Sequence, residues 1–442
     1  MSLKKHDRQY DLVVFGATGK ICEDLAVMKE TLIIGVQTLG YTGKHTAEFV
    51  TKNLPTNLKW AVAGRSQPKL QAVVDACREL VADREQPAIE IADVTDEASI
   101  TALAKKTFIF ISTAGPYSKY GEAVFKGCAE NGTHYVDCTG EFPWVGNMIT
   151  KYEKVAKASG ALMFPQTGLE SAPPDLCSWA MAKCLRENLN AQTGRVIMSI
   201  HTLRSSASGG TIASVLNVFE TFSLKELQAA TKPYAYSPVP REGQGRFQPG
   251  IMARIFGSRN IPDLGTVTTS PAGSTDAFIV ERTWGLLSAT PSRKAEFYGP
   301  NFTFEEYLRV RNWIQGVALH FFLTLGPALL LLSSFARSLL RRVTHQPGQG
   351  SDRASATREE VEYRGTAEPD VKPGSGQKAV CRVRHFGGPY ALSGLLMAQV
   401  ALTLLEEDVQ LDGGIYTSAC LGQGLIDRAA KAGFKIETEI IS

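Results

Sequence analysis

The stretch that decides the fold is Tyr10-Asp-Leu-Val-Val-Phe15-Gly-Ala-Thr-Gly19, an apolar strand that ends in a glycine turn. A second piece, Gly40-Tyr-Thr-Gly43-Lys44, precedes a predicted helix at Thr46–Asn53. Joined together, the two pieces form the fingerprint of a dinucleotide-binding unit. The glycines allow a tight turn beside a pyrophosphate, and the helix N-terminus offers free N–H groups to the phosphates. The predicted cofactor-binding residues are therefore Gly16, Ala17, Thr18, Gly19, Tyr41, Thr42 and Gly43.

Residues 20–40 separate the two halves of this fingerprint, although a dinucleotide loop needs only a few residues between them. Their removal keeps the reading frame, and both ends can be encoded with the GT and AG borders of a short intron. One hypothesis is therefore a retained intron, and the other is a genuine surface insertion. If the segment is translated, we expect it to weaken cofactor binding severely.

Six short apolar runs alternate with helical patterns in the first third of the chain. They lie at Asp11–Phe15, Lys59–Ala63, Ala88–Ile91, Thr107–Ser112, Thr133–Val136 and Ala161–Phe164. This alternation is typical of an α/β fold with a doubly wound parallel sheet, and it predicts a Rossmann-type NAD(P)-binding domain over residues 1–167.

After Gly168 the pattern changes, and it predicts a second, α+β domain over residues 168–388. Longer strand patterns lie at Arg195–Arg204, Ala277–Thr283, Arg358–Gly365 and Lys378–Phe386. Residues 346–357 are rich in Gly, Ser and Gln and are predicted to form a flexible linker. Residues 389–442 are predicted to supply C-terminal helices and a strand that pack back on the core.

Composition limits the class of protein. The chain has 442 residues, of which 44% are hydrophobic and 21% charged, so it is long enough for two or three globular domains. A net charge of +3 gives no electrostatic argument for binding nucleic acid. The eight cysteines form no Cys-x-x-Cys pair, which indicates reduced thiols and no metal site. The charged N-terminus has no signal-peptide core, so secretion is not expected.

An apolar stretch from Trp313 to Phe335 contains no Asp, Glu, Lys or Arg, and arginines flank it on both sides. It is long enough to cross a bilayer. However, Gly326-Pro327 is expected to break or kink a spanning helix. An anchor on the cytoplasmic face of a membrane or lipid droplet fits the flanking arginines better. The alternative is a buried helical hairpin within the second domain.

The second predicted strand indicates which dinucleotide is bound. It ends in Ala63-Gly-Arg65-Ser66, where a cofactor with an unphosphorylated ribose would favour Asp or Glu. Arg65 and Ser66 instead offer a cation and a hydroxyl group that suit a 2′-phosphate. The sequence therefore favours NADP(H) over NAD(H). The alternative is that Arg65 only solvates the strand end.

The fourth predicted strand ends in Ser112-Thr113-Ala114-Gly115-Pro116-Tyr117. A nicotinamide ribose lies beside such strand ends in open α/β sheets, so Thr113, Ala114 and Gly115 are predicted to bind the cofactor. Tyr117 is a catalytic candidate, because its side chain could donate a proton or stack on the ring. A packing role for Tyr117 is the alternative.

Polar residues also follow the fifth predicted strand, where Asp137 and Glu141 become further catalytic candidates. They would face the same sheet edge and orient the cofactor amide or the substrate. Capping of the predicted helix at Trp144–Ser159 explains them equally well.

Two residues are candidates for substrate binding. Ser171 lies in a predicted helix entry at the domain junction, where ligands often bind. Arg204 precedes the small-residue loop Ser205-Ser-Ala-Ser-Gly-Gly210-Thr211, which suits an anionic group.

Taken together, these motifs resemble the saccharopine dehydrogenase-like oxidoreductases, a group that includes the mycobacterial trans-acting enoyl reductases. The resemblance also covers Tyr135–Glu141, Gly168–Asp175, Ser208–Thr211 and Gly413–Gly422, and it leaves out residues 20–40. It implies a nicotinamide-binding Rossmann domain, a second α/β domain and, in eukaryotic members, association with lipid droplets or membranes.

The sequence therefore predicts an NADP-dependent oxidoreductase that reduces a C=C or C=N bond in a lipid-like or acyl-carrier-bound substrate. The rival hypothesis is a non-catalytic membrane or lipid-droplet protein that keeps a degenerate Rossmann domain. A homodimer is one oligomeric state that the sequence leaves open.

Overall fold

The computed structural model describes residues 3–16, 41–204, 218, 221–241, 249–333, 359–371 and 376–442, with the side chains of 41 and 327–332 left out. The predictions for Ala17, Thr18 and Gly19, for the rest of the segment up to residue 40 and for the linker at 346–357 fall outside these ranges.

The first sheet, sheet A, has seven parallel strands in the order β13-β6-β5-β4-β1-β2-β3. Strand β1 lies between β4 and β2, which is the point where the strand order reverses and where ligands bind in open α/β sheets. The prediction of a doubly wound parallel sheet is therefore confirmed. The strands are β1 (Tyr10–Phe15), β2 (Trp60–Gly64), β3 (Ala88–Ile91), β4 (Thr107–Ser112), β5 (His134–Asp137), β6 (Leu162–Phe164) and β13 (Gly414–Ile415).

Helices cover both faces of sheet A, which explains why its strands are almost continuously apolar. One layer contains α1 (Tyr41–Asn53), α2 (Gln67–Leu80) and α15 (Gly388–Glu406), in contact along α1. The other contains α3 (Glu97–Lys106), α5 (Glu122–Asn131) and α6 (Phe142–Ser159). The short helix α4 (Tyr117–Tyr120) follows β4. Right-handed crossovers on either side of β1 place the two layers on opposite faces.

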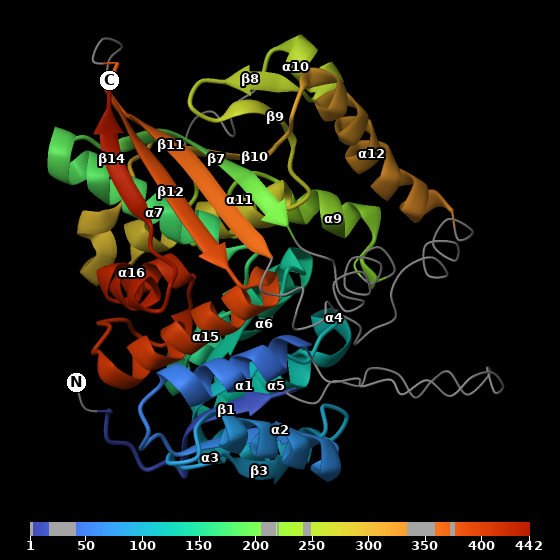
Figure 1. Cartoon of the computed structure of the whole chain (residues 1–442), viewed down its shortest axis with the longest axis vertical. Helices are drawn as coiled ribbons and strands as arrows, with labels where there is room; N and C mark the ends of the chain where they lie inside the picture. Colours follow the sequence, from blue (N-terminus) through green and yellow to red (C-terminus); the bar gives the residue numbers. More distant parts are fainter. Residues whose placement is uncertain are drawn as a thin grey trace.

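The second sheet, sheet B, is mixed and has the order β14-β12-β11-β7-β10-β9-β8. Its only parallel pair among the described strands is β7 with β10. Helices α7 (Ala172–Leu189) and α11 (Gly273–Ala289) pack against it (Figure 1). This arrangement confirms the second α+β unit. The strands are β7 (Thr193–Arg204), β8 (Arg259–Ile261), β9 (Gly265–Thr269), β10 (Thr303–Arg309), β11 (Glu360–Pro369), β12 (Lys378–Phe386) and β14 (Glu437–Ile441).

The expected strand at Ala277–Thr283 is wrong, because these residues lie in the middle of helix α11. The helix is buried on nearly all sides, and a helix surrounded by protein does not show the polar face that a 3.6-residue period would reveal. Two of its charged residues, Glu281 and Arg282, are buried with hydrogen-bond partners. Glu281 accepts a hydrogen bond from Tyr234 N at 2.8 Å, and Arg282 donates to Ile415 O at 2.6 Å.

The C-terminal part of the chain contributes to both sheets. Helix α15 packs across α1. Gly394 allows the two helices to approach closely, because a Cβ on this residue would lie 3.0 Å from Thr46 N. Strand β13 then joins the β6 edge of sheet A, helix α16 (Gly422–Lys431) contacts α15, and β14 joins sheet B. Sheet A is thus completed by residues near the end of the chain.

The apolar stretch forms one helix, α12 (Trp313–Leu332), that reaches outward from the β8–β9 edge of sheet B (Figure 1). The helix continues through Gly326-Pro327, so the expected break there is wrong, and a kink at this place stays a prediction. The alternative of a buried hairpin is also wrong, since Ile314 is 76% and Phe322 is 72% exposed. Among the described residues, the helix with the length and apolarity of a membrane span is α15, which is mostly buried in the core.

Candidate functional site

The carboxyl ends of β1 and β4 meet at Gly16. This residue has φ +85°, and a Cβ on it would lie 2.9 Å from Ala114 N. Thr113 ties the two strand ends together, because both its N–H and its hydroxyl group donate to Phe15 O at 2.9 Å. Only glycine tolerates both the left-handed conformation and the close approach. The structure thus brings the predicted residues Gly16, Thr113 and Ala114 together at the point where the strand order reverses.

Helix α1 begins at Tyr41, so Thr42 and Gly43 lie in its first turn. The first N–H groups of a helix have no partner within the helix and can bind phosphate oxygens. Helix α1 contacts β1, and β1 pairs in parallel with β2. The described parts of the fingerprint therefore form the βαβ unit that a dinucleotide requires.

The end of β2 carries the predicted 2′-phosphate site. Ser66 is the N-cap residue of α2, but its side chain makes no capping hydrogen bond, so the hydroxyl group is not used by the helix. Arg65 is exposed and forms a long ion pair with Asp93, with Nε and Oδ2 3.9 Å apart. A cation, a hydroxyl group and a helix N-terminus therefore lie together where the adenosine ribose of a dinucleotide binds.

Tyr117 is buried at the start of α4. Its hydroxyl group donates to Ser112 O at 2.9 Å and lies 3.5 Å from Cys138 Sγ. Burial raises the pKa of Tyr117 well above its usual value, so the hydroxyl group keeps its proton. In this arrangement Tyr117 links the ends of β4 and β5.

Asp137 is fully buried and holds the loop after β6. Its carboxylate accepts hydrogen bonds from Thr139 N at 2.9 Å, Gln166 N at 2.9 Å and the Tyr135 hydroxyl group at 2.7 Å. Burial raises the pKa of Asp137 to about 6, although these hydrogen bonds oppose the rise. The carboxylate therefore joins the end of β5 to the segment that leads into α7.

Glu141 is also buried, with 1% of its surface exposed. Its carboxylate accepts hydrogen bonds from Tyr117 N at 2.7 Å and Ser118 N at 3.0 Å. Glu141 therefore caps α4, whereas the capping alternative concerned the helix that follows it, α6. The structure gives Tyr117, Asp137 and Glu141 positioning contacts, and a catalytic role for each of them stays a prediction.

The two predicted substrate residues lie apart from this network. Ser171 is buried at the start of α7, where its hydroxyl group accepts a hydrogen bond from Gln166 Nε2 at 3.4 Å. Arg204 ends β7, is 73% exposed, and forms an ion pair with Glu360 at 3.5 Å. The small-residue loop after it lies outside the described ranges. Substrate binding by Ser171 and Arg204 stays a prediction.

The sequence interpretation missed three carboxyl groups at the junction of the two sheets. Asp276 and Glu306 form a buried pair, and Glu170 lies in the loop before α7. Glu170 precedes Ser171 in the Gly168–Asp175 motif. Its carboxyl group becomes a candidate only in the folded structure, where it lies beside Gly140. No sequence spacing relates Asp276 to Glu306, which lie on different elements.

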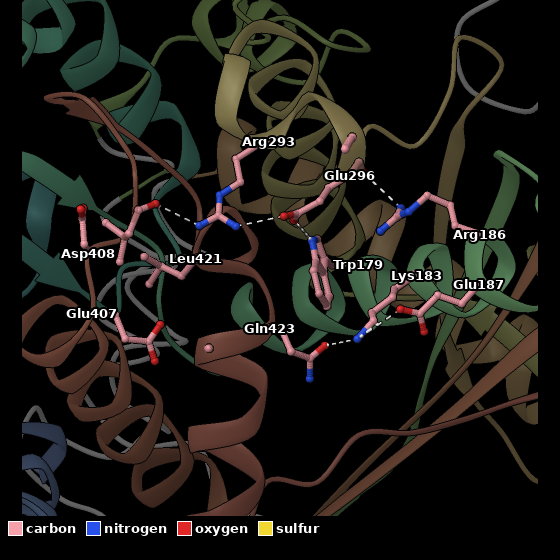
Figure 2. A pocket seen from close by; sticks show the side chains of 13 residues that line it. Trp179, Lys183, Arg186, Glu187, Arg293, Glu296, Glu407, Asp408, Leu421 and Gln423 are labelled. Carbon is pink, nitrogen blue, oxygen red and sulfur yellow. Dashed lines mark hydrogen bonds and ion pairs between the residues drawn. The ribbon is translucent and has the colours of Figure 1, made fainter. Parts of the chain in front are cut away.

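A pocket of about 380 Å³ lies elsewhere, among α7, η1 (Pro291–Glu296), the start of α16 and the segment after α15 (Figure 2). Its charged side chains face one another. Arg293 pairs with Glu296 at 2.9 Å, and Lys183 pairs with Glu187 at 3.5 Å and donates to Gln423. None of its lining residues comes from the strand ends around Gly16, so it is not part of the predicted dinucleotide site. Among the described residues, no group of three or more His, Cys, Asp or Glu side chains could hold a metal ion.

Comparison with known proteins agrees with this geometry. Residues 31–163 match the family described as the saccharopine dehydrogenase NADP binding domain. The match begins after β1, which the structure nevertheless places at the centre of sheet A. A protein of Mycobacterium tuberculosis named as a trans-acting enoyl reductase is 29% identical, over 98% of both chains. The trans-acting enoyl reductase of Mycobacterium leprae is 27% identical, over 98% of this chain and 99% of its own.

Among solved structures, the saccharopine dehydrogenase (L-Glu forming) of Saccharomyces cerevisiae has a TM-score of 0.51 at 10% identity. The alignment covers 98% of this chain and 100% of the yeast chain, so the two proteins share the two-domain fold. Fold and site together define an NADP-dependent oxidoreductase with a Rossmann domain and a second α+β unit. The chain is similar to the saccharopine dehydrogenase-like oxidoreductases over nearly its whole length, and its cofactor is NADP(H). The predicted resemblance and cofactor are therefore confirmed, and the scaffold hypothesis is not favoured.

Replacing Arg65 by alanine is expected to raise the Kd for NADPH by about 10- to 100-fold, because a charge-assisted contact to the 2′-phosphate is worth ~1.5–3 kcal/mol. The Kd for NADH should change less than about twofold. Fluorescence titration with both nucleotides measures this. Lys119→Ala, which removes an exposed cation on α4, is the control and should alter neither Kd. If the Kd values for NADPH and NADH rise equally, Arg65 only solvates the strand end and does not bind the 2′-phosphate.

Proposed function

We propose that this protein uses NADPH to reduce a carbon–carbon double bond conjugated to a carbonyl group in an acyl substrate. The observation that carries the proposal is the similarity to trans-acting enoyl reductases over 98% of both chains. A C=N bond is the related alternative, because the yeast structural relative is a saccharopine dehydrogenase. Similarity in fold at 10% identity does not by itself support an amino-acid substrate.

The chain's own residues would supply binding and orientation. The glycine turn at Gly16 and the first turn of α1 would hold the pyrophosphate, while Arg65 and Ser66 would hold the 2′-phosphate. When bound, the nicotinamide supplies a hydride. The strand end at Thr113–Gly115 would place the ring at the edge of sheet A that faces sheet B. The buried network of Tyr117, Asp137 and Glu141 would keep this edge rigid.

The test is a comparison of two substrate types. An enoyl thioester and a cyclic imine are each mixed with the protein and NADPH, and the loss of nucleotide absorbance is followed. We expect oxidation of NADPH with the enoyl thioester and a saturated acyl product by mass spectrometry. Turnover of the imine alone would overturn the enoyl assignment and keep the oxidoreductase class.

We also propose that the protein acts at the cytoplasmic face of a membrane or lipid droplet. An apolar surface supports this, made of exposed side chains on α10 (Ile251–Phe256) and α12. The two helices contact each other, and the rings of Phe256 and Trp313 lie 5.5 Å apart. Exposed Arg254 and Arg311 flank it and suit anionic headgroups. The surface comprises Ile251, Met252, Ile255, Trp313, Ile314, Phe321, Phe322 and Leu325.

Replacing Ile314, Phe322 and Leu325 together by glutamine is expected to weaken binding to vesicles by at least about 100-fold, because each buried apolar side chain contributes ~1–2 kcal/mol. Co-sedimentation with vesicles that contain anionic lipid measures the partition. The matched control replaces Ile91, Leu224 and Val371, three exposed apolar residues on other elements, and should bind as the parent does. Equal partition of the two variants would argue against this surface.

A homodimer remains a further proposal. Sheet B is one candidate for the contact surface, and arginines of its ion pairs, such as Arg382 with Glu362 at 2.8 Å, would make that contact polar. Sedimentation velocity at two protein concentrations measures the oligomeric state, and a single monomer peak at both would exclude the dimer.

A further inference from the structure

Glu170 occupies an unusual position at the junction of the two sheets. It lies in the loop between β6 and α7 and is exposed to solvent. Its carboxyl group makes no hydrogen bond or ion pair with any residue in the described ranges, unlike Asp137 and Glu141 nearby. An acidic side chain that is held in place and left without a partner is available to a bound molecule.

The loop that carries Glu170 is fixed at three points. On the β5 side, Gly168 packs so closely that a Cβ there would lie 2.9 Å from the Cβ of Cys138. On the α15 side, Leu169 N donates to Ser393 Oγ at 3.0 Å. On the side of sheet B, the Tyr363 hydroxyl group donates to Leu169 O at 3.0 Å. Glu170 therefore projects from a segment that contacts both sheets.

The carboxylate of Glu170 lies over Gly140. A Cβ on Gly140 would collide with the Glu170 Oε2 atom, so the space that the carboxylate fills exists because residue 140 has no side chain. Gly140 follows β5, and β5 pairs with β4, whose carboxyl end forms the predicted nicotinamide edge. Glu170 is thus one strand away from this edge and on the side that faces sheet B.

We propose that Glu170 is the proton donor of the reduction, an assignment that rests on the proposed function. Hydride addition to the β-carbon leaves a pair of electrons on the α-carbon and the carbonyl oxygen of the substrate. The O–H bond of the Glu170 carboxylic acid breaks, and a C–H bond forms at the α-carbon. The carboxylate that remains takes a proton from solvent, to which Glu170 is exposed. Each turnover therefore consumes one hydride and one proton.

The surroundings of the Glu170 carboxyl group favour its protonated form. Although Glu170 is exposed, the protein atoms packed beside its carboxyl group displace part of the surrounding water, which raises the pKa of Glu170 above its usual value. The carboxyl group of Asp276 on α11 lies near enough for the charge of Glu170 to act on it, and Asp276 is paired with Glu306 of β10. Cys138 and Tyr363 are the other titratable groups beside the loop, and both are neutral at pH 7 because burial raises their pKa values.

The experiment compares three variants with the parent protein. Glu170→Gln removes the acid, and turnover should fall by about 10²- to 10⁴-fold, as for loss of a general acid, while the Kd for NADPH stays within twofold. Gly140→Ala keeps the acid but displaces it, so turnover should fall with folding and NADPH binding preserved. Glu130→Gln removes an exposed carboxylate at the far end of α5 and is the matched control. Parent-like turnover of Glu170→Gln would overturn the proposal.

Two further readouts separate this proposal from the proposed function. The turnover of the parent protein should decline as pH rises through the pKa of Glu170, and this decline should vanish in Glu170→Gln. Infrared titration of the protein without cofactor should show one carboxylic acid band that is present in the parent and absent in Glu170→Gln. If the parent reduces no enoyl substrate, the proposed function fails. If the parent is active and the band is missing, only the proton donor is wrong.

Discussion

Deleting residues 20–40 is expected to lower the Kd for NADPH by about 100-fold. The deletion joins Gly19 to Tyr41, so the glycine turn and the first turn of α1 can contact the same pyrophosphate. Two or three backbone N–H groups that gain a charged acceptor, together with the helix dipole, account for ~3 kcal/mol. Fluorescence titration of the parent and the deletion variant with NADPH measures the change.

The control for this deletion removes residues 346–357, a Gly- and Ser-rich segment of the second domain, and should leave the Kd unchanged. Sequencing of the transcript separates the two explanations of the segment, because a retained intron is missing from most messages. If the parent and the variant bind NADPH equally well, the segment does not interrupt the cradle. If neither binds, the oxidoreductase interpretation of this polypeptide is wrong.

The stability of the protein is expected to fall as pH rises from 5 to 8, and the buried pair of Asp276 and Glu306 is one cause. Neither oxygen of Asp276 has a hydrogen-bond donor within the described ranges, and Glu306 receives one at 2.6 Å from Ser270. Burial raises the pKa of both groups, and for Asp276 the charge of Glu306 raises it further. Two carboxyl groups so placed hold at least one proton between them.

The direction of this change in stability with pH is set by proton binding. A group whose pKa is higher in the folded state than in the unfolded state binds protons more tightly when folded, so its stabilising effect is complete below the unfolded pKa of about 4. The effect is lost as pH rises through the folded pKa. Burial also raises the pKa of Asp137 to about 6 and that of Asp175 to about 7, so both act in the same direction. The rise at Asp137 alone corresponds to ~3 kcal/mol.

Glu306→Gln should reduce this pH dependence, because its amide can donate a hydrogen bond to an ionised Asp276. We expect the variant to be more stable than the parent by ~1–3 kcal/mol at pH 8 and to show a shallower slope between pH 5 and 8. Urea unfolding at both pH values measures the difference. Glu368→Gln, at an exposed position on β11, is the control and should follow the parent. An unchanged slope in Glu306→Gln would show that the pair does not carry a shared proton.

The first sheet could be predicted well because each strand is a short apolar run between turn signals. The six predicted runs coincide with β1 to β6 to within a residue or two. Strand β13, by contrast, contributes two residues, Gly414 and Ile415, which are too few to give a pattern. Helix α11 was mistaken for a strand because burial on all sides removes the polar face that marks a helix.

The candidate site was predictable where backbone geometry dictates the residue type. Gly16 can be recognised from sequence because the turn excludes any other residue, and Arg65 because it replaces an expected acid. Glu170 and the pair of Asp276 and Glu306 could not be found in this way. The place of Glu170 depends on contacts of its loop with Ser393 and Tyr363, which are 224 and 194 residues away from Leu169. Asp276 meets Glu306 only when α11 packs on β10.

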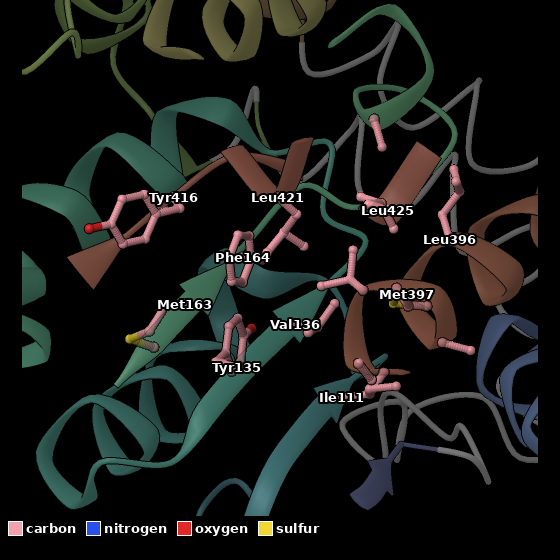
Figure 3. Close-up of a cluster of buried hydrophobic side chains, with 14 of the residues drawn as sticks. Ile111, Tyr135, Val136, Met163, Phe164, Leu396, Met397, Tyr416, Leu421 and Leu425 are labelled. Carbon is pink, nitrogen blue, oxygen red and sulfur yellow. The ribbon is translucent and has the colours of Figure 1, made fainter. Parts of the chain in front are cut away.

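Helix α15 and strand β13 are translated near the end of synthesis, and this affects how the chain folds on the ribosome. Figure 3 shows Met397 of α15 beside Val136 and Ile111 of sheet A, and the same buried cluster contains Leu396 and Phe164. The nucleotide-binding half therefore lacks part of its apolar interior and one edge strand until residue 415 has been translated. A nascent chain that stalls after residue 167 leaves the edge of β6 and the apolar surface of α1 uncovered, and such a fragment is a substrate for chaperones.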